Sequence, residues 1–287
     1  MRGRRRSSAS SSRVRFSGAS SGAAHRQWYR AIADHYDGFA NPVWMGRTEV
    51  FLDRLFRRHG IGNAVDVACG TFAIDLRLAK RGYEIVGRDL SPDMIRVGRR
   101  ALRMAGLRAD LGVADMRTLR VRRKFDAVLC LGTAFNYLAE PRDVRLALRS
   151  FRHLLRPGGL LVLDLTNFDA FIDRPMNVRT EMDYRTSDGT RIGIFGFNDQ
   201  NPSKTVHIAR FLTVVQRGRD IRIGFDEAPL KVWRKEGIAR ALAREGFRLV
   251  EWWGDLRVGS QYRRKTSPRL VVVACAPDRT GKFRETP

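Results

Sequence analysis

The sequence predicts an α/β protein built on a doubly wound sheet of seven strands. Apolar runs that suit strands alternate with helix-like segments between residues 64 and 165, which favours parallel pairing. Several of these runs are apolar at every position, as is typical of strands covered by helices on both faces. Residues 167–232 interrupt the alternation with strands joined by polar turns, and the alternation then resumes.

The size and composition of the chain suit one such domain with an insertion. The chain has 287 residues, of which 43% are hydrophobic. No apolar run approaches the roughly 18 residues of a membrane span, so we expect a cytoplasmic protein. The cysteines are odd in number and far apart, which argues against a disulfide framework or a metal site; they are Cys69, Cys130 and Cys275.

The chain is strongly basic, with a formal net charge of +24. Residues 1–33 carry eight arginines and no acid, and subtracting these eight charges still leaves +16. Such a surface favours nucleic acid, anionic membranes or acidic metabolites, although a generally arginine-rich or heat-adapted surface is the simpler explanation. Residues 1–24 are nearly devoid of apolar side chains and are predicted to be disordered, with an organelle transit peptide as the alternative.

Two helices are expected before the sheet. Trp28, Ile32 and Tyr36 recur every four residues, which is typical of a short amphipathic helix. The second helix covers residues 47–59, and its apolar face is formed by Val50, Phe51, Leu55 and Phe56.

Five strands and three helices follow in alternation. The strands are expected at residues 64–68, 84–87, 111–114, 125–131 and 160–165. Gly82 closes the first helix, and Ser91 can cap the second, with Pro92 in its first turn. The third helix is expected to end at Pro157-Gly158-Gly159 and to present Val144, Leu148, Phe151 and Leu155.

An antiparallel insertion is predicted after the fifth strand. Its strands are expected at residues 191–197, 205–215 and 221–225, with turns at Ser187-Asp188-Gly189, Asn201-Pro202 and Arg217-Gly218-Arg219. A helix closed by Gly246 and strands at 249–253 and 270–274 then complete the sheet. The predicted organisation is a basic tail (1–24), a core (25–166), the insertion (167–232), the completion of the core (233–276) and a flexible end (277–287).

The segment from Asp66 to Asp89 predicts a ligand site. It reads strand, tight turn, helix, strand and acid. Ala68 and Gly70 let the backbone approach a ligand, and Asp89 can accept both hydroxyls of a ribose. Gly70 is the only glycine between Asp66 and Gly82, so the pyrophosphate of a dinucleotide would be poorly bound. The pattern therefore indicates an adenosine-containing ligand.

Three segments carry a resemblance to a known family: Asp66-Val67-Ala68-Cys69-Gly70-Thr71, residues 86–94 and residues 155–160. In this order and spacing they resemble the motifs of class I S-adenosylmethionine (SAM)-dependent methyltransferases, which have a Rossmann-like sheet. Within this family the chain most resembles N-methyltransferases that act on amino sugars or glycine-type amino acids. In these enzymes a strand-rich insertion covers the substrate pocket.

The resemblance implies SAM as the cofactor. It places Asp66 against the SAM amino group, Asp89 on the ribose and Asp115 on the adenine amino group. Further cofactor contacts are implied for Tyr36, Ala68, Cys69, Gly70, Leu90, Met116, Leu131 and Gly132. Without the resemblance, three of these residues have simpler explanations. Asp115 could be a turn residue, Met116 a core residue, and Tyr36 a residue that packs the first helix against the rest of the protein.

The chain departs from the family pattern at two positions. Ala68 replaces the usual first glycine, which is a mild change. Phe72 replaces the last glycine of the motif, and a phenylalanine resists a positive φ. We therefore expect either a different turn at this position or a shifted pose of the SAM tail.

Catalysis by such a protein requires few dedicated residues. The sulfonium of SAM is already activated, so the protein must chiefly align the nucleophile for in-line displacement. Weak candidates for a catalytic role are Tyr36, Asn136 and His207, and no metal site is expected. Asn167, after the fifth strand, is a candidate for substrate contact.

Three functional classes stay open. The first is methyl transfer to a small-molecule acceptor, an amine nitrogen, by a monomer or homodimer. The second, a nucleic-acid methyltransferase, is suggested by the charge, but Gly132-Thr133-Ala134-Phe135 lacks the Pro-Pro-aromatic motif of exocyclic-amine enzymes. The basic tail also lacks interleaved stacking aromatics. The third class, a non-catalytic scaffold, is suggested by Phe72.

Overall fold

The computed structural model describes residues 32–39, 42–170, 179–186, 188–200 and 205–278. The predicted basic tail, Trp28 and the Asn201-Pro202 turn lie outside the described residues. Of the first expected helix, the described part is a short 3-10 helix, η1 (Ala33–Phe39).

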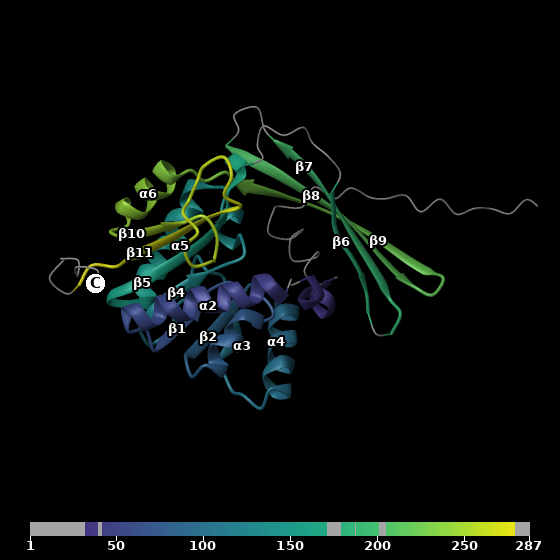
Figure 1. The fold of residues 1–287 in the computed structure, drawn as a ribbon, viewed down its shortest axis with the longest axis horizontal. Helices are drawn as coiled ribbons and strands as arrows, with labels where there is room; N and C mark the ends of the chain where they lie inside the picture. Colours follow the sequence, from purple (N-terminus) through teal and green to yellow (C-terminus); the bar gives the residue numbers. More distant parts are fainter. Residues whose placement is uncertain (1–31, 40–41, 171–178, 187, 201–204, 279–287) are drawn as a thin grey trace, which may run out of the picture.

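A seven-stranded sheet forms the centre of the molecule, with strand order β10-β11-β5-β4-β1-β2-β3 (Figure 1). The first five strands pair in parallel, and β11 runs antiparallel to both β5 and β10. The strands are β1 (Asn63–Asp66), β2 (Glu84–Asp89), β3 (Leu111–Val113), β4 (Phe125–Cys130), β5 (Leu155–Thr166), β10 (Arg248–Trp253) and β11 (Arg269–Cys275). The predicted α/β fold class is confirmed, and the antiparallel strand near the edge is the feature that the prediction lacked.

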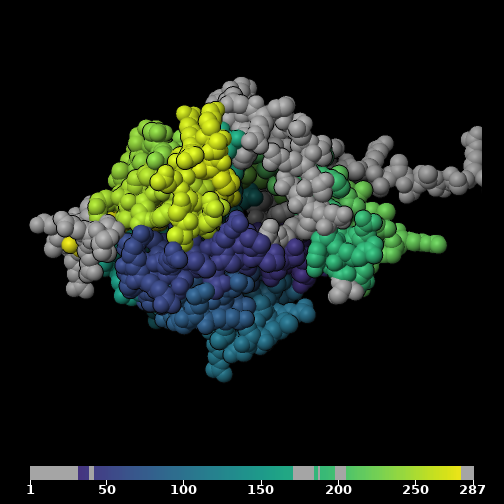
Figure 2. Space-filling model, in the orientation of Figure 1, coloured from purple at the N-terminus to yellow at the C-terminus, as the bar shows by residue number. Residues whose placement is uncertain are grey.

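The segment between β10 and β11, residues 254–268, lies at the same edge of the sheet as the carboxyl end of β5. This follows from the register, because Arg269 at the start of β11 pairs with Thr166 at the end of β5. Figure 2 shows this segment (yellow) lying against α2 (purple; Pro42–His59).

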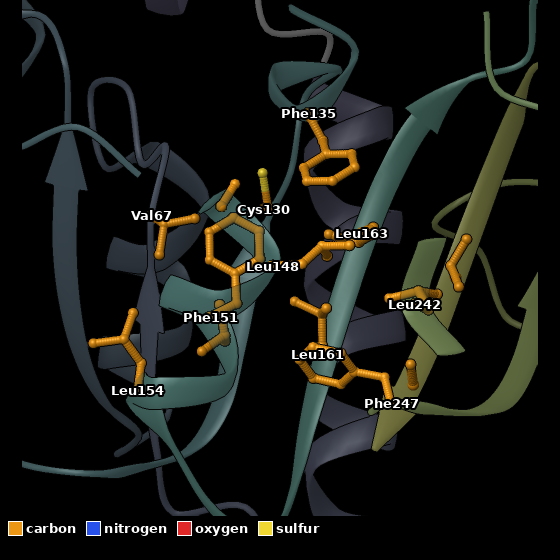
Figure 3. Close-up of a cluster of buried hydrophobic side chains, with 14 of the residues drawn as sticks. Val67, Cys130, Phe135, Leu148, Phe151, Leu154, Leu161, Leu163, Leu242 and Phe247 are labelled. Atoms are coloured by element: carbon orange, nitrogen blue, oxygen red, sulfur yellow. The ribbon is translucent and has the colours of Figure 1, made fainter. Parts of the chain in front are cut away.

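Helices cover both faces of the sheet. One face packs against α2 together with α3 (Ala73–Lys80) and α4 (Pro92–Met104). The other face packs against α5 (Pro141–Leu154) and α6 (Lys235–Arg244). Figure 3 shows Leu148, Leu161 and Leu242 among the side chains that fill this second layer. The buried strands therefore read as continuous apolar runs because neither face meets water.

Two details of the helices differ from the prediction. Val50 was expected on the buried face of α2, but it is 42% exposed, because the buried positions of this helix are 48, 51, 52, 53, 55 and 56. Helix α5 ends at Leu154, and Leu155 is already extended and pairs with Phe125. Pro157-Gly158-Gly159 consequently lies inside β5 and does not end the helix.

The insertion is a four-stranded antiparallel sheet of order β6-β7-β8-β9, which extends to one side of the core (Figure 1). Its strands are β6 (Arg179–Arg185), β7 (Arg191–Gln200), β8 (Val206–Arg217) and β9 (Asp220–Lys231). Three of them were expected, and β6 was not. At the base of this sheet, Ala209 and Leu230 pack against Phe168 in the short helix η3 (Phe168–Ala170).

Phe72 takes a left-handed backbone conformation at the N-terminus of α3, with φ 65°, and its side chain is fully buried. Its ring occupies space that two glycines leave open. A Cβ at Gly87 would lie 2.9 Å from the Phe72 ring, and one at Gly98 would lie 3.2 Å from the Phe72 Cβ. The left-handed conformation costs roughly 1–2 kcal/mol for a residue with a side chain. Burial of a phenylalanine contributes about 1.5–3 kcal/mol, which offsets that cost.

Phe72 thus adopts the positive φ that a phenylalanine was expected to resist, and its ring points into the core between β2 and α4. The adjustment lies in Gly87 and Gly98, which are distant in sequence from the turn. The expected change in the turn or in the pose of the SAM tail stays a prediction.

We predict that Gly98→Ala destabilises the protein by about 1–3 kcal/mol, because the new Cβ would overpack a filled core. It would lie 3.1 Å from both Leu111 and the Thr71 carbonyl oxygen, which leaves no room without a shift of α4. The matched control is Gly46→Ala in α2, where nothing lies within 4 Å of the new Cβ. Since alanine favours helices over glycine, the control is expected to stabilise the protein by up to about 1 kcal/mol. Urea unfolding measures both, and a Gly98→Ala variant as stable as wild type would contradict this packing.

Candidate functional site

The turn after β1 lies against the end of β2 at the carboxyl edge of the sheet. The Cys69 amide donates to the Arg88 carbonyl oxygen at 3.0 Å, and the Phe72 amide donates back to Cys69 at 2.8 Å. Gly70 has φ 52°, so the turn requires the conformational freedom of glycine at this position. The Cys69 side chain is buried in the core beside Gly87, which leaves its backbone as the part that can line a ligand.

Asp89 connects this turn to the next helix. One carboxylate oxygen accepts from the Gly70 amide at 2.9 Å, and the other accepts from the Ser91 amide at 2.8 Å. Ser91 in turn caps α4 by accepting from the Met94 amide. The structure thus brings together the glycine and the acid that the sequence singled out. Each carboxylate oxygen can accept more than one hydrogen bond, so the arrangement is compatible with a pair of ribose hydroxyls.

Two further carboxyl groups are buried behind this turn. Asp66, at the end of β1, is 2% exposed and accepts from the Ala68 amide at 2.9 Å. Burial raises the pKa of Asp66 to about 7, the Ala68 hydrogen bond opposes this, and the nearby charge of Asp89 adds to it.

Asp75, in the first turn of α3, is the second of these groups and was not singled out by the sequence. It is 1% exposed, and its Oδ1 has no hydrogen-bond partner within the part of the chain that the structure describes. Burial, and then the proximity of Asp66, raise the pKa of Asp75 well above its usual value. A cation bound beside these two acids would favour the ionised form of Asp66, because an opposite charge nearby lowers the pKa of a carboxyl group.

The N-terminal segment η1 reaches the same place. Burial raises the pKa of Tyr36 to about 12, and the charges of Asp89 and Asp37 contribute to this shift, so the phenol stays protonated. Asp37 accepts a hydrogen bond from the Thr71 hydroxyl in the glycine turn. Tyr36 also packs with Ile192 and Ile194 of the insertion. Tyr36 therefore lies beside the predicted site and also joins η1 to the insertion.

Asp115 follows β3 and is bound by its own neighbour. The Arg117 guanidinium bonds both carboxylate oxygens of Asp115 at 2.6–3.0 Å and reaches Asp143 at 2.8 Å. The hydrogen bonds to Asp115 raise the pKa of Arg117 further. An adenine amino group would share Asp115 with this arginine. Met116 is half-buried against the cluster on the α5 side, as an ordinary core residue would be.

The loop after β4 is shaped by a buried ion pair. Leu131 is buried, while Gly132 has φ 61° and donates to the Asp164 carboxylate at 3.0 Å. Asp164 is fully buried and binds the Arg269 guanidinium through both oxygens at 2.7 Å. Arg269 also donates to the hydroxyls of Thr133 and Thr166 at 3.0 Å. This pair was missed at the sequence level, although an acid inside the apolar run of β5 was a signal for it.

The polar candidates for catalysis lie in structural positions. Asn136 is fully buried; its amide nitrogen donates to the Lys231 carbonyl at 2.9 Å and its oxygen accepts from the Thr166 amide. His207 is 3% exposed and stacks on Phe168 with ring centroids 4.5 Å apart. Asn167 donates to the carbonyls of Arg264 and Ser267. These contacts support structural roles, and a catalytic role for Asn136 or His207 stays a prediction.

The described residues hold no group of three or more His, Cys, Asp or Glu side chains that could bind a metal ion. Within the same residues, no helix is long and apolar enough to cross a membrane. All three cysteines are buried and unpaired.

Comparison with known proteins agrees with this geometry. A family model described as a methyltransferase domain matches residues 64–159. The glycine/sarcosine N-methyltransferase of Parasynechococcus marenigrum is 35% identical over 162 residues, which cover 54% of this chain and 56% of that protein. The glycine N-methyltransferase of Rattus norvegicus is 30% identical over 227 residues, covering 70% and 78% of the two chains. The match to the first of these relatives thus spans only about half of its length.

The fold is shared with solved structures as well. The sugar N-methyltransferase from Streptoalloteichus superposes with a TM-score of 0.69 at 21% identity, covering 96% of this chain and 100% of that one. The same family is indicated by the sequence motifs, by the order of the strands and by a relative matched over most of its length. The chain therefore belongs to the class I SAM-dependent methyltransferases.

Proposed function

We propose that this protein transfers the methyl group of SAM to an amine nitrogen of a small molecule. The observation that carries the proposal is the Asp89 carboxylate, which is held between the Gly70 and Ser91 amides at the carboxyl edge of the sheet. Ligands of doubly wound sheets bind at this edge. The relatives named above act on glycine and sarcosine or on a sugar amine, which supports a small amine as the acceptor.

The residues at this edge fit SAM. Asp89 would hold the ribose and the buried Asp66 would face the ammonium group, since a buried carboxylate favours a cation. The backbone of Ala68, Cys69 and Gly70 would line the methionine part. The residues proposed around the remaining surface of the cofactor are Tyr36, Leu90, Asp115, Met116, Leu131 and Gly132. Phe72 does not obstruct this site, because its ring lies in the core.

SAM supplies, when bound, a methyl group on a good leaving group. The protein has to bind and orient the acceptor and to exclude water, and such positioning can supply roughly 7–11 kcal/mol of a barrier. An amine that arrives unprotonated needs no general base. Tyr36, with a pKa of about 12, is suited to donate a hydrogen bond at neutral pH rather than to remove a proton.

We assign the acceptor side of the site to the insertion, residues 167–232. The contacts of Ile192 and Ile194 with Tyr36 attach this sheet to the segment beside Asp89, which supports a cover over the acceptor. A nucleic-acid acceptor remains the second candidate, and the observation in its favour is the net charge of +24.

We predict that Asp89→Ala weakens SAM binding at least about 100-fold, because two hydrogen bonds from the ribose to a charged group would be lost. Titration calorimetry with SAM and with S-adenosylhomocysteine measures the affinity. The control is Asp110→Ala, an exposed acid at the other end of the β2–β3 pair that binds Arg88. Thermal unfolding of each variant verifies that it is folded. Binding by Asp89→Ala within threefold of wild type would refute the assignment, and so would a wild type that binds neither ligand.

A second prediction concerns the pH dependence of stability without SAM. Folded Asp66 holds its proton up to about pH 7, whereas the unfolded chain releases it near 3.8. Folding therefore takes up a proton between these values, and the stability that depends on this group falls as the pH rises through this window. Asp66→Asn removes the titration, so we expect it to melt about 5 °C or more above wild type at pH 8 and close to wild type at pH 4. An equal difference at both pH values would contradict the raised pKa.

A further inference from the structure

A hollow lies at the same edge of the sheet as the proposed SAM site. It has a volume of about 570 Å³ and is lined mainly by residues of the segment 254–268. Figure 2 shows this segment lying against α2. Arg47 is the residue of α2 that lines it. This volume is within the range of small-molecule pockets, which is roughly 300–1,000 Å³.

Hydrogen bonds connect this hollow to the proposed methyl-transfer site. Pro268, in its wall, accepts from the Asn167 amide just beyond the end of β5. The next residue, Arg269, donates to Thr133, which directly follows Gly132 in the loop after β4. An acceptor bound in the hollow could therefore extend toward the SAM site along the carboxyl edge of the sheet.

The wall formed by residues 254–268 is preformed rather than loose. The Asn167 side chain donates to the Ser267 carbonyl at 2.7 Å, and the Ser267 hydroxyl accepts from the Arg263 amide at 2.7 Å. A Cβ at Gly254 would lie 2.7 Å from the Gln261 carbonyl oxygen, so the two sides of the loop are in close contact. A rigid wall reduces the entropy lost when a ligand binds.

Three arginines line the hollow: Arg47, Arg257 and Arg263. All three are exposed, and none makes an ion pair with any residue that the structure describes. Two other arginines near them in the sequence do form ion pairs: Arg264 with Asp169, and Arg269 with Asp164. Asp255 is the acid in the wall, and its Oδ1 accepts from the Leu256 amide.

We propose that this hollow, which we call the arginine pocket (Arg47, Arg257 and Arg263), binds the anionic group of the methyl acceptor, a carboxylate or a phosphate. Guanidinium groups match the geometry of both anions with paired hydrogen bonds. The assignment to the acceptor rests on the proposed function. The volume of the hollow, about 570 Å³, suits a metabolite, whereas a nucleic-acid backbone requires an extended groove.

The test is titration calorimetry of the full chain saturated with S-adenosylhomocysteine. Glycine provides a carboxylate and glucosamine 6-phosphate a phosphate, while glycinamide and glucosamine are their counterparts without the anion. We expect wild type to bind at least one anionic probe more tightly than its counterpart. The double variant Arg257→Gln/Arg263→Gln should weaken that binding at least about tenfold, with no effect on the counterpart. Which anionic probe binds identifies the source of the charge.

The matched control is Arg103→Gln/Arg108→Gln, which removes two exposed arginines from the end of α4 and the loop after it. It should bind the anionic probe as wild type does. The single variants Arg257→Gln and Arg263→Gln, each expected to weaken binding, replace the double variant if that one does not fold.

Several results would overturn the arginine pocket. One is a wild type that binds S-adenosylhomocysteine but neither anionic probe, and another is an equal loss of binding in both double variants. A third is that wild type binds a single-stranded RNA oligonucleotide more tightly than either probe and that Arg257→Gln/Arg263→Gln loses this binding. The ligand of the arginine pocket would then be a nucleic acid and not a metabolite. Failure of wild type to bind S-adenosylhomocysteine would instead refute the proposed function, so the two failures are distinguishable.

Discussion

The carboxyl edge of the sheet depends on the hydrogen bonds that converge on Asp89. This one side chain holds the turn after β1 through the Gly70 amide and the start of α4 through the Ser91 amide. Both amides belong to backbone that secondary structure leaves unpaired, so Asp89 satisfies donors that would otherwise lack a partner. The residue that we assign to the ribose is thus also the residue that joins two strand–helix units. Its structural role and its proposed binding role use the same carboxylate, which would couple cofactor binding to the order of the turn.

A second buried carboxylate organises the other half of this edge. Asp164 and Arg269 form an ion pair in which the acid is fully buried, and this pair orients the Gly132 and Thr133 backbone after β4. A buried pair of this kind adds little net stability, because desolvation of both charges opposes their attraction. Its contribution here is to geometry. It ties the antiparallel strand β11 to the loop that lies beside the proposed SAM site, and it places residues 254–268 next to that loop.

The sequence predicted most elements between residues 63 and 165, because strands buried on both faces leave continuous apolar runs. It failed where pairing decides the conformation. Strand β6 is polar along most of its length and becomes a strand through its pairing with β7. Leu155 satisfies the helical period of α5, yet its pairing with Phe125 makes it extended. Phe72 was read as an obstacle because Gly87 and Gly98, which accommodate its ring, can be recognised only once β2 and α4 are packed beside it.

The same distinction explains how far the candidate site could be predicted. Asp66, Gly70 and Asp89 were recognisable because one strand–turn–helix–strand unit contains them. Asp37 and the Asp164–Arg269 pair act through contacts with distant elements, and Asp75, although inside the same unit, is distinguished only by its burial. The ion pairing of the arginines likewise depends on contacts that only the fold creates. The sequence counts Arg257, Arg263, Arg264 and Arg269 alike toward a net charge of +24. In the fold, Arg264 and Arg269 are neutralised by buried acids, while Arg257 and Arg263 face a hollow together with Arg47. The net charge alone could not separate a generally basic surface from an anion site. Ion pairing narrows the candidates, because an unpaired guanidinium can bind a ligand without first losing a partner. The shared hollow then distinguishes Arg47, Arg257 and Arg263 from unpaired arginines elsewhere on the surface.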